Sequence, residues 1–240
     1  MSITTILFDL DGTLLPMDQD SFLNCYLSLL ARKLEPHGYE PGKLVKSILK
    51  GTGAMINNDG SKMNESAFWE TFCGIYGDCA KADLPIFDEF YRTDFDNVRA
   101  SCGYSEKAAE TVREIKKMGF RIALATNPLF PPVATEKRIR FAGLEPGDFE
   151  LYTTYENSRY CKPNLNYYKD VVSALGVECD ECVMVGNDVS DDMVAERLGM
   201  KVFLLTDCLI NKECVDISKY PHGGFDDLLT YVVACKNNKF

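Results

Sequence analysis

A short apolar run that ends in acidic residues is the feature of this sequence that most limits its fold. The run covers residues 3–8, and the segment 9–13, with the sequence Asp-Leu-Asp-Gly-Thr, follows it directly. The run lacks the alternation of apolar and polar residues that marks a strand with one wet face, so it predicts a strand buried on both faces. Such strands occur in parallel sheets covered by helices on both sides. The segment therefore predicts an α/β protein.

Further along the chain, strand patterns alternate with amphipathic helix patterns. Apolar runs predict strands at residues 120–125, 182–185 and 201–205, and a short segment near Leu151 and Tyr152 is a candidate for another. Helical periodicity predicts helices at residues 105–119, 135–142, 163–175, 191–198 and 225–233. Strands that alternate with helices are typical of a parallel sheet between two helical layers. We therefore expect a three-layer α/β core.

Residues 15–99 interrupt this alternation. Helical patterns predict helices at residues 20–35, 41–51, 64–76 and 84–95, with Asn64 as a candidate N-cap, and no convincing strand lies between them. The aromatic residues at helical spacing, such as Phe68 and Phe72, are expected to form a core. We therefore divide the chain into an α/β core domain of residues 1–14 and 100–240 and an inserted all-helical domain of residues 15–99.

Charge and composition exclude several classes of protein. The chain has 26 basic and 36 acidic side chains, a formal net charge of -10, which repels nucleic acid and anionic membranes. No apolar run reaches the roughly 18 residues of a membrane span, and the N-terminus lacks a signal-peptide pattern, so we expect a cytoplasmic protein. The 10 cysteines are expected to be free thiols. The presence of only 2 histidines argues against a multi-histidine metal site.

Polar residues follow three of the predicted strands at the point where each strand ends. They are Asp9 with Asp11, Thr126 with Asn127, and Asn187 with Asp188. Ligands of open α/β sheets bind outside the carboxyl ends of the strands, so we expect these side chains to converge. A carboxylate cluster without histidine suits Mg²⁺. Lys162, just before a predicted helix at the same edge, would supply positive charge for an anionic substrate.

The order of these segments resembles the four motifs of the haloacid dehalogenase-like hydrolase superfamily, and the resemblance covers the whole chain. The motifs are Asp9-Leu10-Asp11-Gly12-Thr13, Thr126, Lys162-Pro163, and Gly186-Asn187-Asp188 with Asp191-Asp192. The resemblance implies a Rossmann-like core and identifies residues 15–99 as a helical cap that selects the substrate. The basic residues of this segment are then candidates for contacts with a substrate anion: Arg32, Lys33, Lys43, Lys46, Lys50 and Lys62.

The resemblance also implies a role for each motif residue. Asp9 is implied as the nucleophile and Asp11 as the general acid and base, while Thr126 and Lys162 contact the phosphate. Asn127 is a further candidate for phosphate binding. A carboxylate that attacks phosphorus forms an acyl phosphate, which divides a slow hydrolysis into two easier displacements. Asp11 would protonate the leaving oxygen and later deprotonate water.

The fourth motif departs from the most common form of the superfamily. Asn187 stands where Asp usually follows the glycine, and Asp188 comes one residue later. A carboxylate binds Mg²⁺ better than an amide, so we expect Asp188, with Asp9 and the main-chain carbonyl of Asp11, to hold the metal, and Asn187 stays a neutral alternative. Asp191 and Asp192 are candidates for orienting Lys162 or for capping the following helix.

The sequence therefore predicts a Mg²⁺-dependent phosphatase that hydrolyses a small phosphorylated metabolite through an aspartyl-phosphate intermediate. A phosphomutase of the same superfamily is one alternative, and a non-catalytic binding or regulatory protein on the same scaffold is another. A dehalogenase is disfavoured, because those enzymes lack the second carboxylate that Asp11 supplies here. The sequence leaves the substrate and the oligomeric state open.

Overall fold

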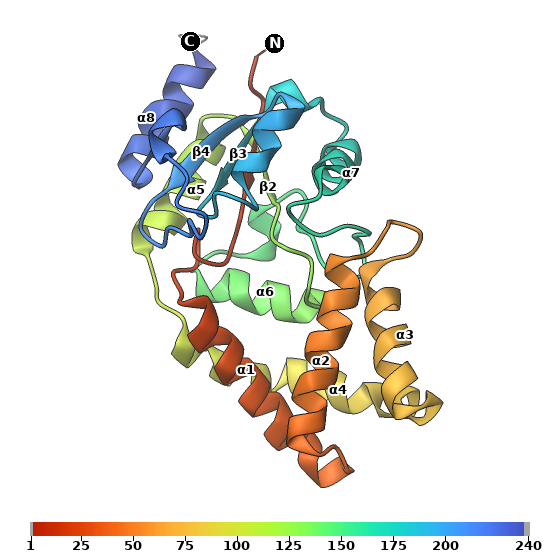
Figure 1. Cartoon of the computed structure of the whole chain (residues 1–240). Coiled ribbons are helices and arrows are strands. Elements are labelled where there is room, and N and C mark those ends of the chain that lie inside the picture. The colour runs from red at the N-terminus through yellow and green to blue at the C-terminus, as the bar shows by residue number, and fades with distance from the viewer. Residues whose placement is uncertain (1, 238–240) are drawn as a thin grey trace.

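The computed structural model describes residues 2–237 and contains one parallel sheet (Figure 1). Its strand order is β2-β1-β3-β4-β5, and the strands are β1 (Thr5–Phe8), β2 (Arg121–Leu124), β3 (Cys182–Gly186), β4 (Lys201–Leu205) and β5 (His222–Gly223). All adjacent strands are parallel. The predicted α/β fold with a parallel sheet is confirmed. The predicted domain ends at residues 1 and 240 lie outside the described residues.

The strand register brings the expected polar residues to one edge of the sheet. Phe8, the last residue of β1, pairs with Leu124 of β2 on one side and Val185 of β3 on the other. The chain segments that leave these three strands therefore begin side by side. The predicted strand near Tyr152 is reduced to a single bridge to Leu124, and the two-residue edge strand β5 was not predicted.

Side chains alternate between the two faces of the sheet and build two cores. Ile6 and Phe8 of β1 belong to the core under α5 (Glu106–Lys117), α6 (Pro132–Phe141) and α8 (Phe225–Lys236). Leu7 belongs to the other core, under α7 (Leu165–Leu175). Figure 1 shows α5 and α8 on one side of the sheet and α7 on the other. This arrangement is the expected three-layer core, because a strand side chain changes face at every residue.

Four helices occupy the segment between β1 and α5. They are α1 (Gln19–Leu34), α2 (Pro41–Ile56), α3 (Asn64–Tyr76) and α4 (Leu84–Arg92), and in Figure 1 they lie together below the sheet, opposite the two chain ends. Their shared core is aromatic, with Phe72 and Phe90 fully buried. The two connections to the sheet lie side by side at Met17 and Cys102, which form an antiparallel bridge. The domain limits at residues 14 and 99 stay a prediction.

Several helix limits differ from the predicted ones for reasons of packing. The stop expected at Gly51 is wrong, since α2 continues to Ile56. Gly51 lies within the helix and allows close packing against Phe68, because a Cβ at this position would lie 2.6 Å from the Phe68 ring. The N-cap of α3 is Met63 instead of Asn64, whose side chain is buried and bonded elsewhere. Helix α4 ends at Arg92, three residues early.

Two predicted helices near the site also begin late. The segment 191–198 forms only a 3-10 helix, Met193–Leu198, and the side chain of Asp192, just before it, is bonded to Lys162. Helix α7 begins at Leu165, after Asn164 caps it, instead of at Pro163. No helix within residues 2–237 is long and apolar enough to cross a membrane. The cysteines whose side chains the structure describes are free thiols, as expected.

Candidate active site

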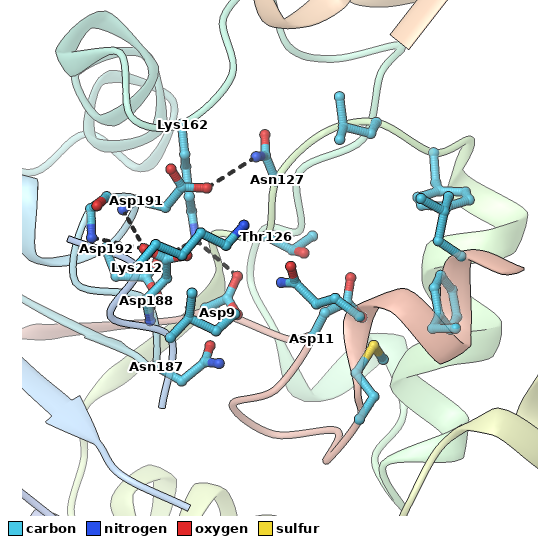
Figure 2. A pocket seen from close by; sticks show the side chains of 18 residues that line it. Asp9, Asp11, Thr126, Asn127, Lys162, Asn187, Asp188, Asp191, Asp192 and Lys212 are labelled. Atoms are coloured by element: carbon cyan, nitrogen blue, oxygen red, sulfur yellow. Dashed lines mark hydrogen bonds and ion pairs between the residues drawn. The ribbon is translucent and has the colours of Figure 1, made fainter. Parts of the chain in front are cut away.

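A pocket of about 370 Å³ lies at the carboxyl edge of the sheet (Figure 2). All six residues proposed from the sequence line it: Asp9, Asp11, Thr126, Asn127, Lys162 and Asp188. Five aspartates and two lysines contribute to the lining, so the pocket carries more negative than positive groups. Asp9 and Lys162 are at least nine-tenths buried, which strengthens the electrostatic interactions between them.

Asp9 lies at the base of the pocket because its backbone continues β1. Its N–H donates to the carbonyl of Val185 at 2.9 Å, which fixes the side chain at the sheet edge. The Thr13 hydroxyl donates to Asp9 Oδ2 at 3.1 Å and is 2.9 Å from Asn187 Oδ1. Gly12, with φ of 83°, makes this tight turn possible, since a Cβ there would lie 2.4 Å from Asn187 Nδ2.

Lys162 joins two carboxylates from distant parts of the chain. Its ammonium group is 2.8 Å from Asp9 Oδ1 and 2.6 Å from Asp192 Oδ1. Burial by itself lowers the pKa of Lys162, but the carboxylates of Asp192 and Asp9 outweigh burial and raise this pKa well above its usual value. The side chain therefore stays positively charged where a phosphate would meet Asp9.

Asp192 holds Lys162 from behind and also fixes the fourth motif. Its Oδ2 accepts the backbone N–H of Asp188 at 3.0 Å. Burial raises the pKa of Asp192, while the Lys162 ammonium opposes that rise. Gly186 is required at this point, because a Cβ there would lie 2.1 Å from Asp192 Oδ2. Of the two candidates for orienting Lys162, Asp192 makes the contact, and Asp191 lies near Asn127 instead, at 3.5 Å.

Asp188 and Asn187 differ in which of their side-chain atoms are free of hydrogen bonds and so available to bind a metal. One oxygen of Asp188 accepts the backbone N–H groups of Ser190 and Asp191, and its other oxygen has no hydrogen-bond partner among the described residues. Asn187 uses both of its polar atoms, since its amide nitrogen also donates to the Cys208 carbonyl at 2.6 Å. The carboxylate is therefore the freer oxygen ligand of the two.

Thr126 and Asn127 reach the pocket from the end of β2. The Thr126 backbone carbonyl accepts hydrogen bonds from the hydroxyls of Thr153, at 2.6 Å, and Tyr167, at 2.8 Å. These two bonds anchor the backbone at this position, while Thr126 itself lines the pocket. The Asn127 side-chain oxygen is buried without a hydrogen-bond partner. The segment thus presents polar groups to the pocket from a fixed backbone.

Asp11 has a partner that the sequence did not reveal. Arg138 of α6 donates from Nη1 to Asp11 Oδ2, and the other oxygen of Asp11 is buried without a hydrogen-bond partner. The Arg138 side chain is 1% exposed and its guanidinium lies over the Phe130 ring, 4.5 Å from the ring centroid. Burial raises the pKa of Asp11, with Arg138 acting against it and Asp9 adding to it.

A signal for Arg138 was present in the sequence. The residue falls on the same helix face as Ala134 and Thr135, both buried, where an arginine is unusual unless it is paired. Lys212 is a second residue that sequence reasoning missed. It reaches the pocket from the segment after β4, which is held beside the fourth motif by a bridge between Asp188 and Ile210.

The basic residues of the helical segment do not reach the pocket. None of the six candidates is among the residues that line it. Lys33 instead pairs with Glu89 and Asp94, at 3.0 and 3.1 Å, and Lys62 pairs with Glu70. Lys33 and Lys62 are thus paired with acidic residues of the same helical segment, and contact of any of the six with a substrate anion stays a prediction.

The fold and the pocket together define an α/β protein with a carboxylate-rich site at the sheet edge, and the sequence comparison identifies the family. The chain belongs to the haloacid dehalogenase-like hydrolases, because the sequence model of that family matches residues 3–199. The predicted family and the predicted hydrolase are confirmed.

Individual relatives are distant in sequence but similar in length. The pyrophosphatase PpaX of Bacillus velezensis is 26% identical over 200 residues, which are 83% of this chain and 81% of the relative. A predicted phosphoglycolate phosphatase from Haemophilus somnus has a TM-score of 0.59 at 18% identity, with 96% and 98% of the two chains covered. The HAD-hydrolase YfnB of Bacillus subtilis, whose structure contains magnesium, has a TM-score of 0.55 at 16% identity, with 97% and 99% covered.

Proposed function

We propose that this protein is a Mg²⁺-dependent phosphatase that cleaves a small phosphorylated metabolite through a phosphoryl group on Asp9. The observation that carries the proposal is the arrangement of two carboxylates in one pocket with different partners. Asp9 faces the Lys162 ammonium at 2.8 Å, and Asp11 is paired with Arg138. One carboxylate thus lies where an anionic phosphate would be attracted, and the other has the raised pKa of a proton donor.

The reaction divides into two displacements. In the first, an oxygen of Asp9 forms a bond to phosphorus, the bond from phosphorus to the leaving oxygen breaks, and Asp11 gives its proton to that oxygen. In the second, Asp11 takes a proton from water, whose oxygen attacks the phosphorus and releases inorganic phosphate from Asp9. Lys162 and the Thr126 hydroxyl bind the phosphoryl oxygens, and Asn127 is placed to do the same.

The residues of the pocket fit a magnesium ion. Within residues 2–237 no three acidic, histidine or cysteine side chains form a closed metal cluster, but Mg²⁺ needs only one or two carboxylates besides water and phosphate oxygens. Asp9, the main-chain carbonyl of Asp11 and the free oxygen of Asp188 would hold the ion. When bound, it neutralises charge on the phosphate. The magnesium in the structure of YfnB supports the same choice of metal.

The relatives support phosphate ester or anhydride hydrolysis as the reaction. PpaX is named a pyrophosphatase and the Haemophilus somnus protein a phosphoglycolate phosphatase, so the substrate proposed here is a small phosphorylated compound. The acidic chain favours neither nucleic acid nor an anionic membrane as a partner. A cytoplasmic location stays a prediction.

Phosphate release from a panel of phosphate esters, with Mg²⁺ and with a chelator, tests the proposal. We expect turnover that the chelator abolishes and that Asp9→Asn removes. Acid-quenched enzyme should carry a phosphoryl group on Asp9, detectable by peptide mass spectrometry, and Asp11→Asn should accumulate it when the leaving group needs no proton. Wild-type turnover in Asp9→Asn would contradict the mechanism.

The same panel separates the two alternatives. A phosphomutase would move the phosphoryl group to a second hydroxyl and release little inorganic phosphate. A non-catalytic protein on this scaffold would bind phosphate compounds without any turnover. The ion pairs of Asp9 and Asp11 support the catalytic alternative, because the buried Asp9–Lys162 pair is costly to remove from water unless a function maintains it.

A further inference from the structure

A second, apolar cavity adjoins the candidate active site. It has a volume of about 180 Å³ and lies between the helical segment and the loop after β2. Leu23, Leu129 and Phe130 line both this cavity and the catalytic pocket. The remaining wall is mostly aromatic: Tyr26, Phe68, Trp69, Phe87, Tyr91 and Tyr155. The cavity therefore begins where the catalytic pocket ends, on the side of the helical cap.

The wall of this cavity carries no formal charge. Among the described residues that line it there is no Lys, Arg, His, Asp or Glu. The hydroxyls of Tyr26 and Tyr91 are 2.8 Å apart and hydrogen-bonded, and burial raises the pKa of both, so they stay neutral. The Thr52 hydroxyl donates within its own helix, to the Ile48 carbonyl at 3.0 Å. A charged group placed here would lose its hydration without gaining a partner.

The basic side chains near the catalytic pocket are either paired with carboxylates or lie away from the apolar cavity. Lys162 is bound by Asp9 and Asp192, and Arg138 is bound by Asp11. Lys212 is the remaining basic residue of the described pocket lining, and it reaches the pocket beside the fourth motif instead of the apolar cavity. A second phosphate or a carboxylate on the leaving group would therefore meet an apolar wall instead of a cation.

We propose that this cavity binds the leaving group, and that the substrate is the phosphate monoester of an uncharged alcohol with one aromatic ring or a branched alkyl group of similar size. The inference rests on the proposed phosphatase function and adds the substrate class. An apolar cavity of about 150 Å³ holds benzene, so about 180 Å³ fits one ring with a short linker.

Phe130 connects this cavity to the proton donor. Its ring lines both pockets and also contacts the Arg138 guanidinium, which holds Asp11. A ring seated in the cavity would thus place the ester oxygen near Asp11 when the phosphate lies on Asp9. The alcohol takes the proton of Asp11 as its bond to phosphorus breaks, and it leaves as a neutral molecule.

The first test compares substrates of one wild-type enzyme. With Mg²⁺ present, kcat/KM for benzyl phosphate should exceed that for methyl phosphate about 100-fold or more, since an apolar pocket discriminates roughly 10- to 200-fold per added group of methylene size. Pyrophosphate and phosphoglycolate should be no better than methyl phosphate. If either anionic compound is preferred, or if benzyl and methyl phosphate are equal, the substrate class is wrong while the phosphatase function stands. Absence of phosphate release from all four would contradict the proposed function itself.

Binding can be measured without turnover, because Trp69 is the only tryptophan of the chain and lines the cavity. Benzylphosphonate, which cannot be hydrolysed, should change the Trp69 fluorescence in a saturable way in the presence of Mg²⁺. Methylphosphonate should not change it. Equal responses to the two compounds, or no response to benzylphosphonate at concentrations that saturate the enzyme as judged by inhibition, would place the ring outside the cavity. The measurement decides the location of the ring even if turnover is absent.

A matched pair of variants on α2 tests the cavity wall. Leu49 lines the cavity and is 45% exposed, whereas Ile56 is 48% exposed on the same helix and lines neither pocket. Leu49→Asp should lower kcat/KM for benzyl phosphate about 10-fold more than kcat/KM for methyl phosphate, because a carboxylate disfavours an apolar ligand. Ile56→Asp should change neither value. Equal effects of the two variants, or equal effects of Leu49→Asp on both substrates, would overturn the assignment.

Discussion

At the scale of single residues, two of the carboxylates in the pocket are two positions apart in sequence but have different hydrogen-bond partners. Asp9 accepts hydrogen bonds from Thr13 and Lys162, and Asp11 turns toward Arg138. In the proposed mechanism, the attack on phosphorus would use the first environment, and proton transfer to the leaving oxygen would use the second. Neighbouring acidic groups can hold separate roles because their surroundings, and not their identities, decide when each one carries a proton.

Replacing Arg138 tests the proposed role of Asp11. We expect Arg138→Met to slow the first displacement about 10- to 100-fold for alkyl phosphates, because Arg138 positions Asp11, whose proton these leaving groups need, and general acid catalysis contributes roughly 10²- to 10⁴-fold. In rapid-quench measurements of that displacement the loss should be much smaller for 4-nitrophenyl phosphate, whose leaving group departs as the anion. Arg138→Lys should restore part of the activity. Equal losses for both kinds of ester would show that Arg138 only stabilises the fold.

Replacing Asp188 tests the proposed metal ligand. Asp188→Ala should raise the Mg²⁺ concentration needed for half-maximal activity far more than Asp192→Asn does, because Asp188 has a free carboxylate oxygen and Asp192 is occupied by Lys162. Asp192→Asn should instead raise KM, since it loosens Lys162. Titrations of activity against Mg²⁺ and against substrate measure the two effects. The reverse order would move the metal away from Asp188.

At the scale of elements, the turn after β1 is the part of the fold whose shape the site depends on most. Gly12 packs against the Asn187 side chain, so the turn from β1 and the loop from β3 fix each other. Helix α3 is attached to the same region: the Asn64 and Glu65 backbone N–H groups donate at 2.8 Å to the carbonyls of Ser158 and Tyr155, in the segment that leads to Lys162. Helix α3 of the insert is therefore hydrogen-bonded to the segment that precedes Lys162.

Two glycine variants distinguish the effect of backbone strain from the effect of disturbing the contact between Gly12 and the Asn187 side chain. Gly12 and Gly38 have φ of 83° and 87°, but only Gly12 has a close neighbour, while nothing lies within 4 Å of a Cβ on Gly38. Gly38→Ala should lower the free energy of unfolding by about 1–2 kcal/mol, the cost of a left-handed conformation, with normal activity. Gly12→Ala should lower it further and abolish turnover. Denaturant unfolding and kcat measure both, and an active Gly12→Ala would contradict the close packing.

At the scale of the whole molecule, residues that follow the strands and residues of the helical insert together line the pocket. Figure 1 shows both chain ends on the side of the sheet opposite that insert. The pocket lining joins residues from all three thirds of the sequence. Five aspartates face two lysines there, in a chain with a net charge of -10. A divalent cation would relieve repulsion between segments that only the native fold brings together, so its binding should stabilise the entire structure.

Magnesium should therefore raise the melting temperature. At 100 times its dissociation constant a ligand that binds only the folded state adds about 2.7 kcal/mol, which corresponds to roughly 5–10 °C for a chain of this size. Sodium chloride of equal ionic strength should have little effect, and Asp188→Ala should lose most of the shift. Differential scanning calorimetry measures these changes. A shift that survives in Asp188→Ala, or that sodium chloride reproduces, would place the cation elsewhere.

Local periodicity was enough to predict most of the architecture. The apolar runs that became β1, β2, β3 and β4 are visible in the sequence, since a strand buried on both faces requires them. Parallel strands end at one edge, so the polar residues that follow them had to lie close together. That is why the sequence by itself assigns residues as distant as Asp9 and Asp188 to one pocket.

The tertiary structure alone decided how those residues are paired and what lies beside them. The contact of Arg138 with Asp11 and that of Asp192 with Lys162 join segments that no sequence period links, and they depend on how α6 and the fourth-motif loop pack. The apolar cavity has the same origin, because its wall combines side chains from several helices and the loop after β2. Sequence patterns report which face of an element is buried, whereas pair contacts and cavity shape arise only when the elements pack together.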